Sequence, residues 1–442
     1  MQTIHELLQA GAPEAPALGA PGRAPLTYGT LRALAEATVA RLNGLGIGRG
    51  DRVAIVLPNG PEMAAAFVAI GAGATTAPLN PAYRDEEYAF YLSDLGAKAL
   101  LVEAGSDSPA VAVAGRLGVP VLRLAADIEG GAGGFRLEGE AGGSAERPGL
   151  AEAGDIALVL HTSGTTSRPK IVPLAQANVA ASARHIRETL ALTPADRCLN
   201  IMPLFHIHGL IAAVLSTLSA GASVFCTPGF NALKVFQWLD EAEPSWYTAV
   251  PTMHQAILDR APRNAEAVGR AALRFIRSSS SSLPPQVMAA LEQTFGCPVI
   301  ESYGMTEAAH QMTSNRLPPG ARKAGSVGPA AGPEVAVMTA DGRRLGPGEI
   351  GEVVIRGPNV TAGYENNPAA NAEAFAHGWF HTGDQGMLDA DGYLSITGRL
   401  KEIINRGGEK ISPREVDEVL MDHPAVAQVV TFALPHPKLG EE

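Results

Sequence analysis

Residues 160–174 read LHTSGTTSRPKIVPL, and this stretch decides the interpretation of the whole chain. The apolar run Ile156–Leu160 leads into it and ends at small hydroxyl residues, a glycine and Lys170. Small residues let backbone N–H groups converge on phosphate oxygens, and a lysine adds a mobile positive charge. The stretch therefore predicts a phosphate-binding loop after a buried strand. The Walker pattern GxxxxGK[ST] is not present, which argues against P-loop chemistry, and a solvated Ser/Thr turn is the alternative.

Similar apolar runs recur along the chain and alternate with helical patterns. The runs are Val53–Leu57, Ala99–Val102, Val224–Cys226 and Val299–Ile300, and the helical patterns include Pro61–Ala74 and Pro285–Phe295. Buried strands separated by helices predict an α/β fold with mainly parallel sheets. Residues 129–154 lose this periodicity and are rich in Gly, Ala and Glu, so we expect a mobile surface connection there.

The last hundred residues have a different pattern. After Pro347, β-type runs are separated by Gly and Asp turns, and a helix over Pro413–Met421 and a strand over Ala427–Leu434 follow. We expect a large N-terminal domain over residues 1–398, with a β-rich subdomain from about residue 325, and then a hinge and a small α+β domain over 399–442. Because a domain of this size has only marginal stability by itself, we expect it to be incomplete, with further residues beyond Glu442.

Composition limits the classes of partner. The 442 residues carry 34 Lys and Arg against 45 Asp and Glu, a formal net charge of −11, which favours neither nucleic acid nor an anionic membrane. The N-terminus lacks a signal-peptide pattern, and no run reaches the roughly 20 apolar residues of a membrane span. We therefore expect a cytoplasmic protein, with a C-terminal address signal and the oligomeric state left open. Cys198, Cys226 and Cys297 are predicted to be free, buried thiols.

The phosphate-loop string resembles the signature of the adenylate-forming superfamily of acyl-CoA synthetases, adenylation domains and luciferases. That signature usually reads TSGTTGxPK, and Ser167 stands here at its second glycine. Further blocks typical of the superfamily follow in order: Tyr303–Glu307 (YGMTE), His381–Asp384 (HTGD), Gly398–Ile403 (GRLKEI) and Gly407–Gly408. The resemblance covers nearly the whole chain.

The resemblance implies roles for particular residues. Nucleotide binding falls to Thr162, Ser163, Gly164, Thr165, Thr166, Ser302, Tyr303, Gly304, Asp384 and Arg399, and catalysis to Lys170, Thr306, Glu307 and Arg399. Glu307 also offers the hard oxygen ligand that suits Mg²⁺ on ATP phosphates. Lys401 corresponds to the hinge, and Asn405, Gly407 and Gly408 to the coenzyme A channel. A further lysine of the superfamily would lie beyond Glu442.

The implied reaction has two steps. A carboxylate attacks Mg·ATP to give an acyl-adenylate and pyrophosphate, and coenzyme A then gives acyl-CoA and AMP. ATP, Mg²⁺ and coenzyme A are the expected cofactor and co-substrates. Two alternatives remain: an enzyme that loads a carrier protein, and a sensor that binds nucleotide or acyl-AMP without turnover.

Three segments are expected to form the acid pocket: Phe205–Gly209 (FHIHG), Arg277–Leu283 (RSSSSSL) and Ala308–Met312 (AAHQM). His206, His208, Ser281 and His310 are the candidate substrate-binding residues. Two imidazoles and a run of serines suit a second carboxylate better than a hydrocarbon tail. We therefore expect a short dicarboxylate, and the segments resemble the oxalate-CoA ligase branch. A short- or medium-chain fatty acid or an aromatic acid is the alternative, with the histidines as core residues.

Overall fold

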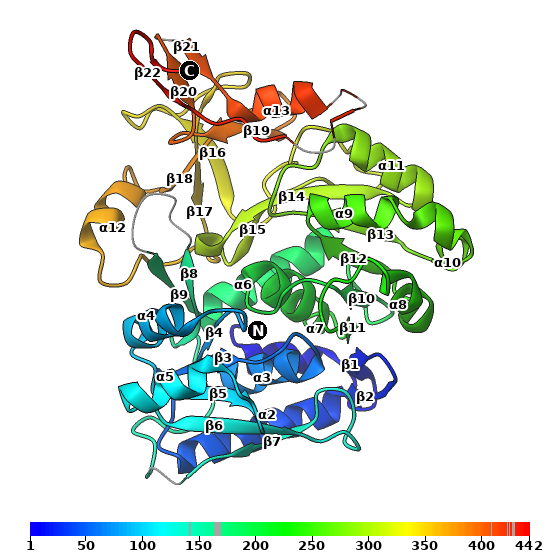
Figure 1. Cartoon of the computed structure of the whole chain (residues 1–442), viewed down its shortest axis with the longest axis vertical. Coiled ribbons are helices and arrows are strands. Elements are labelled where there is room, and N and C mark those ends of the chain that lie inside the picture. The colour runs from blue at the N-terminus through cyan, green and yellow to red at the C-terminus, as the bar shows by residue number, and fades with distance from the viewer. Residues whose placement is uncertain (141–142, 163–168, 408, 422, 424, 427–428) are drawn as a thin grey trace.

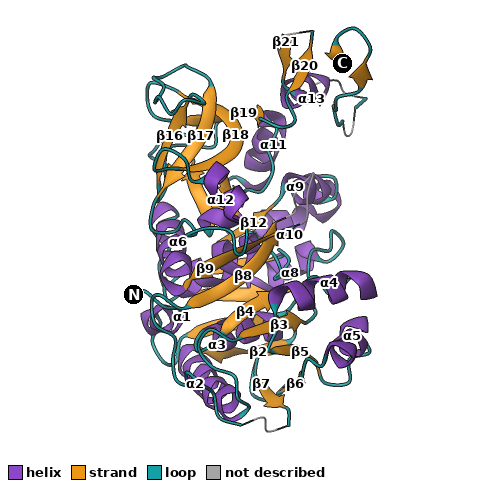
Figure 2. Ribbon diagram, turned by 90° about the vertical axis from the view of Figure 1, so that its left-hand side faces the viewer, coloured by secondary structure: helices purple, strands orange, loops and turns teal. Residues whose placement is uncertain are grey.

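The computed structural model describes residues 1–140, 143–162, 169–407, 409–421, 423, 425–426 and 429–442. Two large sheets and their helices make up most of the molecule, and two small antiparallel sheets follow at the C-terminal end (Figure 1). Figure 2 shows the same stacking from the side, with α2 (Tyr28–Gly44) at one end and β20 and β21 at the other. The predicted α/β fold class is confirmed.

The N-terminal sheet has seven strands with a parallel centre and one antiparallel strand at each edge. Helices α4 (Asp85–Leu95) and α5 (Pro109–Leu117) cover one face, and α2 and α3 (Pro61–Gly71) cover the other. The strands, in sheet order, are β7 (Phe135–Glu138), β6 (Val121–Ala126), β5 (Ala99–Glu103), β3 (Arg52–Val56), β4 (Thr75–Pro78), β8 (Ile156–Thr162) and β9 (Lys170–Ala175).

The second sheet has eight strands and is parallel from β14 to β1. Helices α8 (Val235–Ala242), α9 (Pro251–Leu258), α10 (Ala265–Arg270) and α11 (Pro285–Phe295) pack on its outer face. The strands, in sheet order, are β15 (His310–Ser314), β14 (Val299–Met305), β13 (Phe275–Ser278), β12 (Trp246–Ala249), β10 (Arg197–Asn200), β11 (Ser223–Cys226), β1 (Pro16–Ala20) and β2 (Arg23–Thr27).

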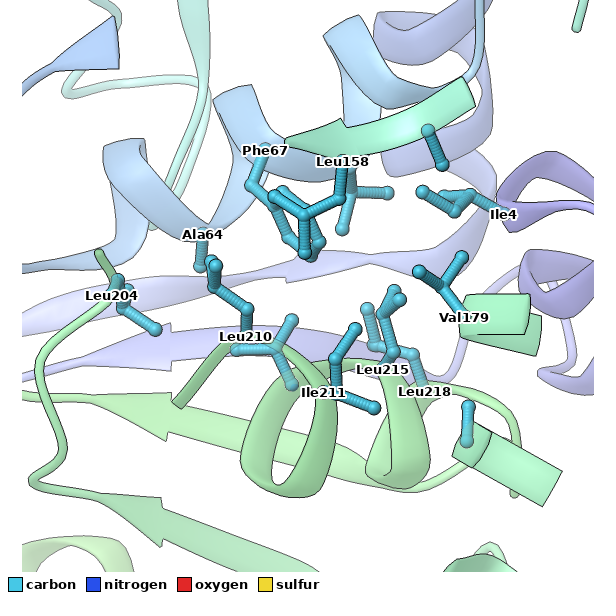
Figure 3. Close-up of a cluster of buried hydrophobic side chains, with 14 of the residues drawn as sticks. Ile4, Ala64, Phe67, Leu158, Val179, Leu204, Leu210, Ile211, Leu215 and Leu218 are labelled. Atoms are coloured by element: carbon cyan, nitrogen blue, oxygen red, sulfur yellow. The ribbon is translucent and has the colours of Figure 1, made fainter. Parts of the chain in front are cut away.

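The largest apolar cluster lies between these sheets. Figure 3 shows Phe67 of α3, Leu158 of β8 and Leu210 and Leu215 of a π-helix (His208–Leu215) turned toward one another. Helix α6 (Gln176–Thr189) and the short helices α1 (Ile4–Leu7) and α7 (Ser216–Leu218) complete this layer. Each large side chain buried here contributes about 1.5–3 kcal/mol, so the core fixes the π-helix that begins at His208.

The C-terminal third is β-rich, as predicted. One antiparallel sheet contains β16 (Glu334–Met338), β17 (Gly351–Arg356), β18 (Phe380–Leu388) and β19 (Leu394–Arg399), with α12 (Pro368–Ala374) beside it. The last sheet contains β21 (Glu409–Ile411), β20 (Ile404–Arg406), β23 (Gly440–Glu441) and β22 (Pro435–His436), and α13 (Pro413–Met421) packs on β19. The exact division of the chain into domains at residue 398 stays a prediction.

Two local predictions were wrong. Residues 129–154 are not a structureless connection throughout, because Phe135–Glu138 pairs with β6 as strand β7. The predicted strand Ala427–Leu434 lies partly outside the described residues, and its residues 429–434 are not a strand. Leu434 instead exchanges backbone hydrogen bonds with Glu442, while Val430 and Phe432 are exposed. A strand needs a paired neighbour along its length, and among the described residues only Leu434 of this segment has such backbone pairing.

The three cysteines are free and buried, as predicted. Within the described part of the chain, no helix combines the length and the apolar character that a membrane crossing requires.

Candidate active site

A cleft of about 1150 Å³ opens between the eight-stranded sheet and the C-terminal elements. The loop Ser280–Ser282 and the strand segment Ser302–Met305 line one side, and Asp384 and Arg399 line the other together with residues of α13. The carboxyl ends of β13 and β14 supply the first side, which is where parallel sheets bind ligands. The elements that line the cleft, α9, α11, β14, β18, β19 and α13, lie in the upper half of Figure 1.

Three of the predicted nucleotide-binding residues meet in this cleft. The Tyr303 hydroxyl donates to Asp384 Oδ2, and Arg399 Nε donates to Asp384 Oδ1 at 2.9 Å. Burial raises the pKa of Tyr303 well above its usual value, and the neighbouring Asp384 adds to this rise, so the phenol keeps its proton and remains a donor. Gly383, at φ +74°, lies within β18 where the pairing with β17 shifts register, and Asp384 follows it in the same strand.

Glu307 and Lys170 form a second group with Tyr364. The Tyr364 hydroxyl donates to Glu307 Oε1 at 2.7 Å, and Lys170 Nζ lies 4.4 Å from the centre of the Tyr364 ring. Burial raises the pKa of Glu307, while the Tyr364 hydroxyl and the positive charge of Lys170 oppose that rise. Glu307 is only 5 % exposed, so its carboxylate is held in one position by these neighbours.

The remaining residues around these groups are placed as follows. Thr162 ends β8 and pairs with Lys170 of β9, while Ser163, Gly164, Thr165 and Thr166 lie outside the described residues. Thr306 begins the short 3₁₀ turn Thr306–Ala308 that carries Glu307. Ser302 Oγ lies 3.1 Å from Ser314 Oγ of β15.

Gly304 is required by close packing. A Cβ atom at this position would lie 1.8 Å from the carbonyl oxygen of His310, so any side chain would push β15 away from β14. Tyr303–Met305 belong to β14 and pair with β15.

His208 and His310 lie together, as predicted. Their rings stack with centroids 4.8 Å apart at 23°, and both residues are almost fully buried. His208 Nδ1 is 2.9 Å from Ser280 Oγ, and His208 Nε2 is 2.6 Å from Thr248 Oγ1. Burial lowers the pKa of both imidazoles well below the usual value, and the charge of Arg277 lowers both further. Both rings are therefore neutral at neutral pH.

Arg277 supplies a positive charge beside this pair. Its guanidinium is fully buried and donates to His208 Nε2 at 3.4 Å, Thr248 Oγ1 at 3.3 Å and Gln311 Oε1 at 3.4 Å. Burial lowers its pKa to about 9, which leaves it protonated at neutral pH. Among the described residues no carboxylate pairs with it, so the cluster carries a net positive charge without a counter-ion.

The other predicted residues lie nearer the surface. Ser281 is exposed and lines the cleft, while His206 is exposed with its ring against Phe205. Lys401 is exposed in the turn between β19 and β20, and the backbone N–H of Asn405 donates to Glu441 Oε2 at 2.7 Å. Gly407 has φ +62°, and Gly408 lies outside the described residues.

A model of the family described as AMP-binding enzyme matches residues 8–365. The chain belongs to this family.

Two curated relatives are oxalate-CoA ligases. The chain is 47 % identical over 437 residues to the one from Arabidopsis thaliana, covering 97 % of this chain and 85 % of the relative. It is 42 % identical over 422 residues to the one from Saccharomyces cerevisiae, covering 89 % and 76 %. The crystal structure of ATP-bound MatB from Rhodopseudomonas palustris matches all of this chain and 87 % of its own, at 30 % identity and a TM-score of 0.88. The expectation of an adenylate-forming enzyme, an acid-thiol ligase, is confirmed.

Sequence reasoning missed Tyr364 and Thr248 of this AMP-binding enzyme's candidate site, and it placed Arg277 and Ser280 in the pocket segment Arg277–Leu283 without assigning either a role. Tyr364 contacts Glu307 from 57 positions away in the chain, so no local pattern links them. Thr248, Arg277 and Ser280 surround His208. The one available signal was an arginine in an otherwise buried strand, Phe275–Ser278, because arginine is rarely buried without a partner.

Proposed function

We propose that this AMP-binding enzyme is an acid-CoA ligase whose acid is a short dicarboxylate such as oxalate. The observation that carries the choice of acid is the buried guanidinium of Arg277, which no carboxylate of the described residues neutralises. A buried charge without a counter-ion is costly, and the neutral imidazoles of His208 and His310 do not neutralise it. A hydrocarbon tail would leave the charge uncompensated, whereas a second carboxylate would compensate it. The two curated relatives, which are oxalate-CoA ligases, support this choice of substrate.

In the first half-reaction one carboxylate oxygen attacks the α-phosphorus of ATP, and pyrophosphate leaves. Tyr303 lies against the adenine, and Asp384 accepts from the ribose hydroxyls. Lys170 and Thr306 donate to the phosphates, where charge develops in the transition state. Lys170 rests over the Tyr364 ring at 4.4 Å, a contact that its flexible side chain can exchange for phosphate.

Glu307 is the residue that would hold Mg²⁺. The described residues contain no group of three or more His, Cys, Asp or Glu side chains suited to a metal. A single buried carboxylate nevertheless fits, because Mg²⁺ is usually bound through one or two carboxylates plus substrate phosphates. When bound, the ion supplies positive charge to the phosphates. Tyr364 and Lys170 favour the ionised carboxylate that such a ligand requires.

In the second half-reaction the C-terminal elements turn about Lys401, and the coenzyme A thiol attacks the acyl-adenylate to release AMP. Lys401 sits in an exposed turn, where a change of backbone angles meets little packing. Asn405 and Gly407 line the approach of coenzyme A, and Gly408, which the resemblance also implies for this role, lies outside the described residues. The three buried cysteines take no part, since no covalent enzyme intermediate is formed.

A substitution of His310 tests the choice of acid. His310→Ala removes one imidazole from the cluster around Arg277 and enlarges the space beside it. The value of kcat/KM for oxalate should therefore fall about thirtyfold, while the value for butyrate should fall less or rise. His254→Ala is the control, because His254 is also fully buried but lies on α9, where its Nδ1 is 3.3 Å from the Tyr247 hydroxyl, and it does not stack on His208. Equal losses for both acids in His310→Ala would contradict the proposal and assign the histidine to the core. Release of AMP that depends on coenzyme A separates a ligase from a carrier-loading enzyme or a sensor.

A further inference from the structure

Tyr364 contacts the side chains of both Lys170 and Glu307. Lys170 Nζ lies 4.4 Å from the centre of the Tyr364 ring, and the hydroxyl at the tip of that ring donates to Glu307 Oε1 at 2.7 Å. Tyr364 is 7 % exposed and Glu307 is 5 % exposed, so bulk water has little access to these contacts. In the described structure Lys170 and Glu307 share this tyrosine and form no ion pair with each other.

A direct ion pair would be the expected arrangement for these two charges. Opposite charges attract strongly where water is excluded, and a lysine side chain is long and flexible enough to reach a nearby carboxylate. Such a pair would occupy both the ammonium that binds phosphate and the carboxylate that binds Mg²⁺. A cation–π contact is a weaker attraction than a buried ion pair, so the phosphates of ATP can displace it more easily.

Backbone hydrogen bonds hold the segment that carries Tyr364 against both of its partners. The N–H of Thr361 donates to the carbonyl of Glu307 at 2.7 Å. The N–H of Glu365 donates at 3.1 Å to the carbonyl of Ile171, which follows the lysine in β9. The main chain therefore fixes the ring relative to both charged groups, and the position of the ring does not depend on the charges themselves.

We propose that Tyr364 is a positioning residue that keeps Lys170 and Glu307 apart and thereby leaves both of them free for Mg·ATP. The face of the ring gives the ammonium a resting place that the phosphates can take over. The hydroxyl fixes the orientation of the carboxylate that would hold the metal ion. The proposal rests on the roles proposed above for Lys170 and Glu307.

Two variants of Tyr364 separate the ring from the hydroxyl. The dissociation constant of ATP would be measured by calorimetry without any acid substrate, once with Mg²⁺ and once in Mg²⁺-free buffer. Tyr364→Phe keeps the ring, so the Mg²⁺-free affinity should not change, while the gain in affinity that Mg²⁺ provides should shrink about fivefold. Tyr364→Leu also removes the ring, so Lys170 should pair with Glu307 and the Mg²⁺-free affinity should fall about tenfold.

A double-mutant cycle tests the separation of the two charges. Glu307→Gln cannot form an ion pair and would release Lys170. In Mg²⁺-free buffer this substitution should therefore raise the ATP affinity about tenfold more in the Tyr364→Leu background than in the wild-type background. A general folding defect of Tyr364→Leu would not be relieved by a change at Glu307. An equal effect of Glu307→Gln in both backgrounds would overturn the proposal.

Tyr393→Leu is the matched control. Tyr393 is 5 % exposed, and Lys323 Nζ lies over its ring at the same distance of 4.4 Å. This lysine pairs with Asp389 and Asp391, which have no proposed role in binding ATP. Tyr393→Leu should therefore keep the wild-type ATP affinity in both buffers.

The outcomes separate this inference from the proposed function. Wild-type affinity of Tyr364→Leu in both buffers would overturn the role of the ring, and an undiminished gain from Mg²⁺ in Tyr364→Phe would overturn the role of the hydroxyl. An ATP affinity of the wild-type enzyme that does not depend on Mg²⁺ would contradict the role proposed for Glu307, while the Mg²⁺-free cycle would still decide whether the ring keeps the charges apart. Because no acid is present, none of these results depends on which acid the enzyme activates.

Discussion

Replacing Arg277 with methionine should separate stability from substrate binding. Methionine has a similar length and no charge, so the variant removes the buried guanidinium with little change of volume. Burial lowers the pKa of Arg277 from 12.5 to about 9. At about 1.4 kcal/mol per pKa unit, the charged form is destabilised by on the order of 5 kcal/mol.

The loss of three hydrogen bonds offsets part of that gain. They are long, at 3.3–3.4 Å, and contribute about 0.5–1.5 kcal/mol each. The free energy of unfolding of the ligand-free Arg277→Met protein should therefore stay near the wild-type value or rise by about 1–3 kcal/mol. Because the cation is lost, kcat/KM for oxalate should fall by about thirtyfold or more.

Urea unfolding of the ligand-free proteins and steady-state kinetics with oxalate measure the two effects. Arg274→Met is the matched control: Arg274 lies three residues earlier and pairs with the buried Asp196 at 3.1 Å, so its loss removes charge-assisted hydrogen bonds from that carboxylate and should destabilise the fold by about 1–2 kcal/mol. If Arg277→Met is destabilised as much as Arg274→Met, the charge has a counter-ion in the fold and the reasoning is refuted.

Three further predictions concern other parts of the molecule. Glu307→Gln should keep the hydrogen bond from Tyr364 but lose Mg²⁺-dependent pyrophosphate exchange, since an amide is a poor ligand; a wild-type exchange rate would remove Glu307 from the mechanism. Lys401→Pro should keep adenylation and slow thioester formation, because it fixes φ near −65° in the turn, and equal loss of both half-reactions would show a chemical role instead. Burial lowers the pKa of His254 to about 3. Below about pH 6.5 the unfolded chain therefore binds a proton at this histidine that the folded chain does not bind, and the free energy of unfolding decreases as the pH is lowered. His254→Gln should therefore reduce the loss of unfolding free energy between pH 7 and pH 5 by about 2 kcal/mol, and an unchanged loss in urea titrations would show that His254 is protonated in the fold.

The sequence predicted those parts of the fold that local patterns determine. Short apolar runs bounded by turn residues located the ends of β3, β5 and β8 within two residues, because a buried parallel strand needs apolar side chains on both faces. Strand β7 was missed because it lies in a glycine-rich segment without an alternating apolar pattern. Its pairing with β6 is a tertiary contact that the local sequence does not indicate. The segment 429–434 was mistaken for a strand because β propensity does not supply the neighbour that a strand needs.

The candidate site was predictable only where a motif carried it. The YGMTE and HTGD blocks identified Tyr303 and Asp384, and the structure shows that they share a hydrogen bond. Tyr364 and Thr248 were not predictable, since their contacts depend on how distant segments pack. The neutral state of His208 was also not predictable, because it arises from burial and from the charge of Arg277 on the adjacent strand.

A comparison of acids with the wild-type enzyme tests the central claim most directly. Release of AMP that depends on coenzyme A would be measured with ATP, Mg²⁺ and oxalate, butyrate or hexanoate under identical conditions. The buried charge of Arg277, which no carboxylate of the described residues neutralises, predicts that oxalate gives the highest kcat/KM of the three acids. Turnover of hexanoate with none of oxalate would contradict the account and make the cluster of Arg277, His208 and His310 a part of the core.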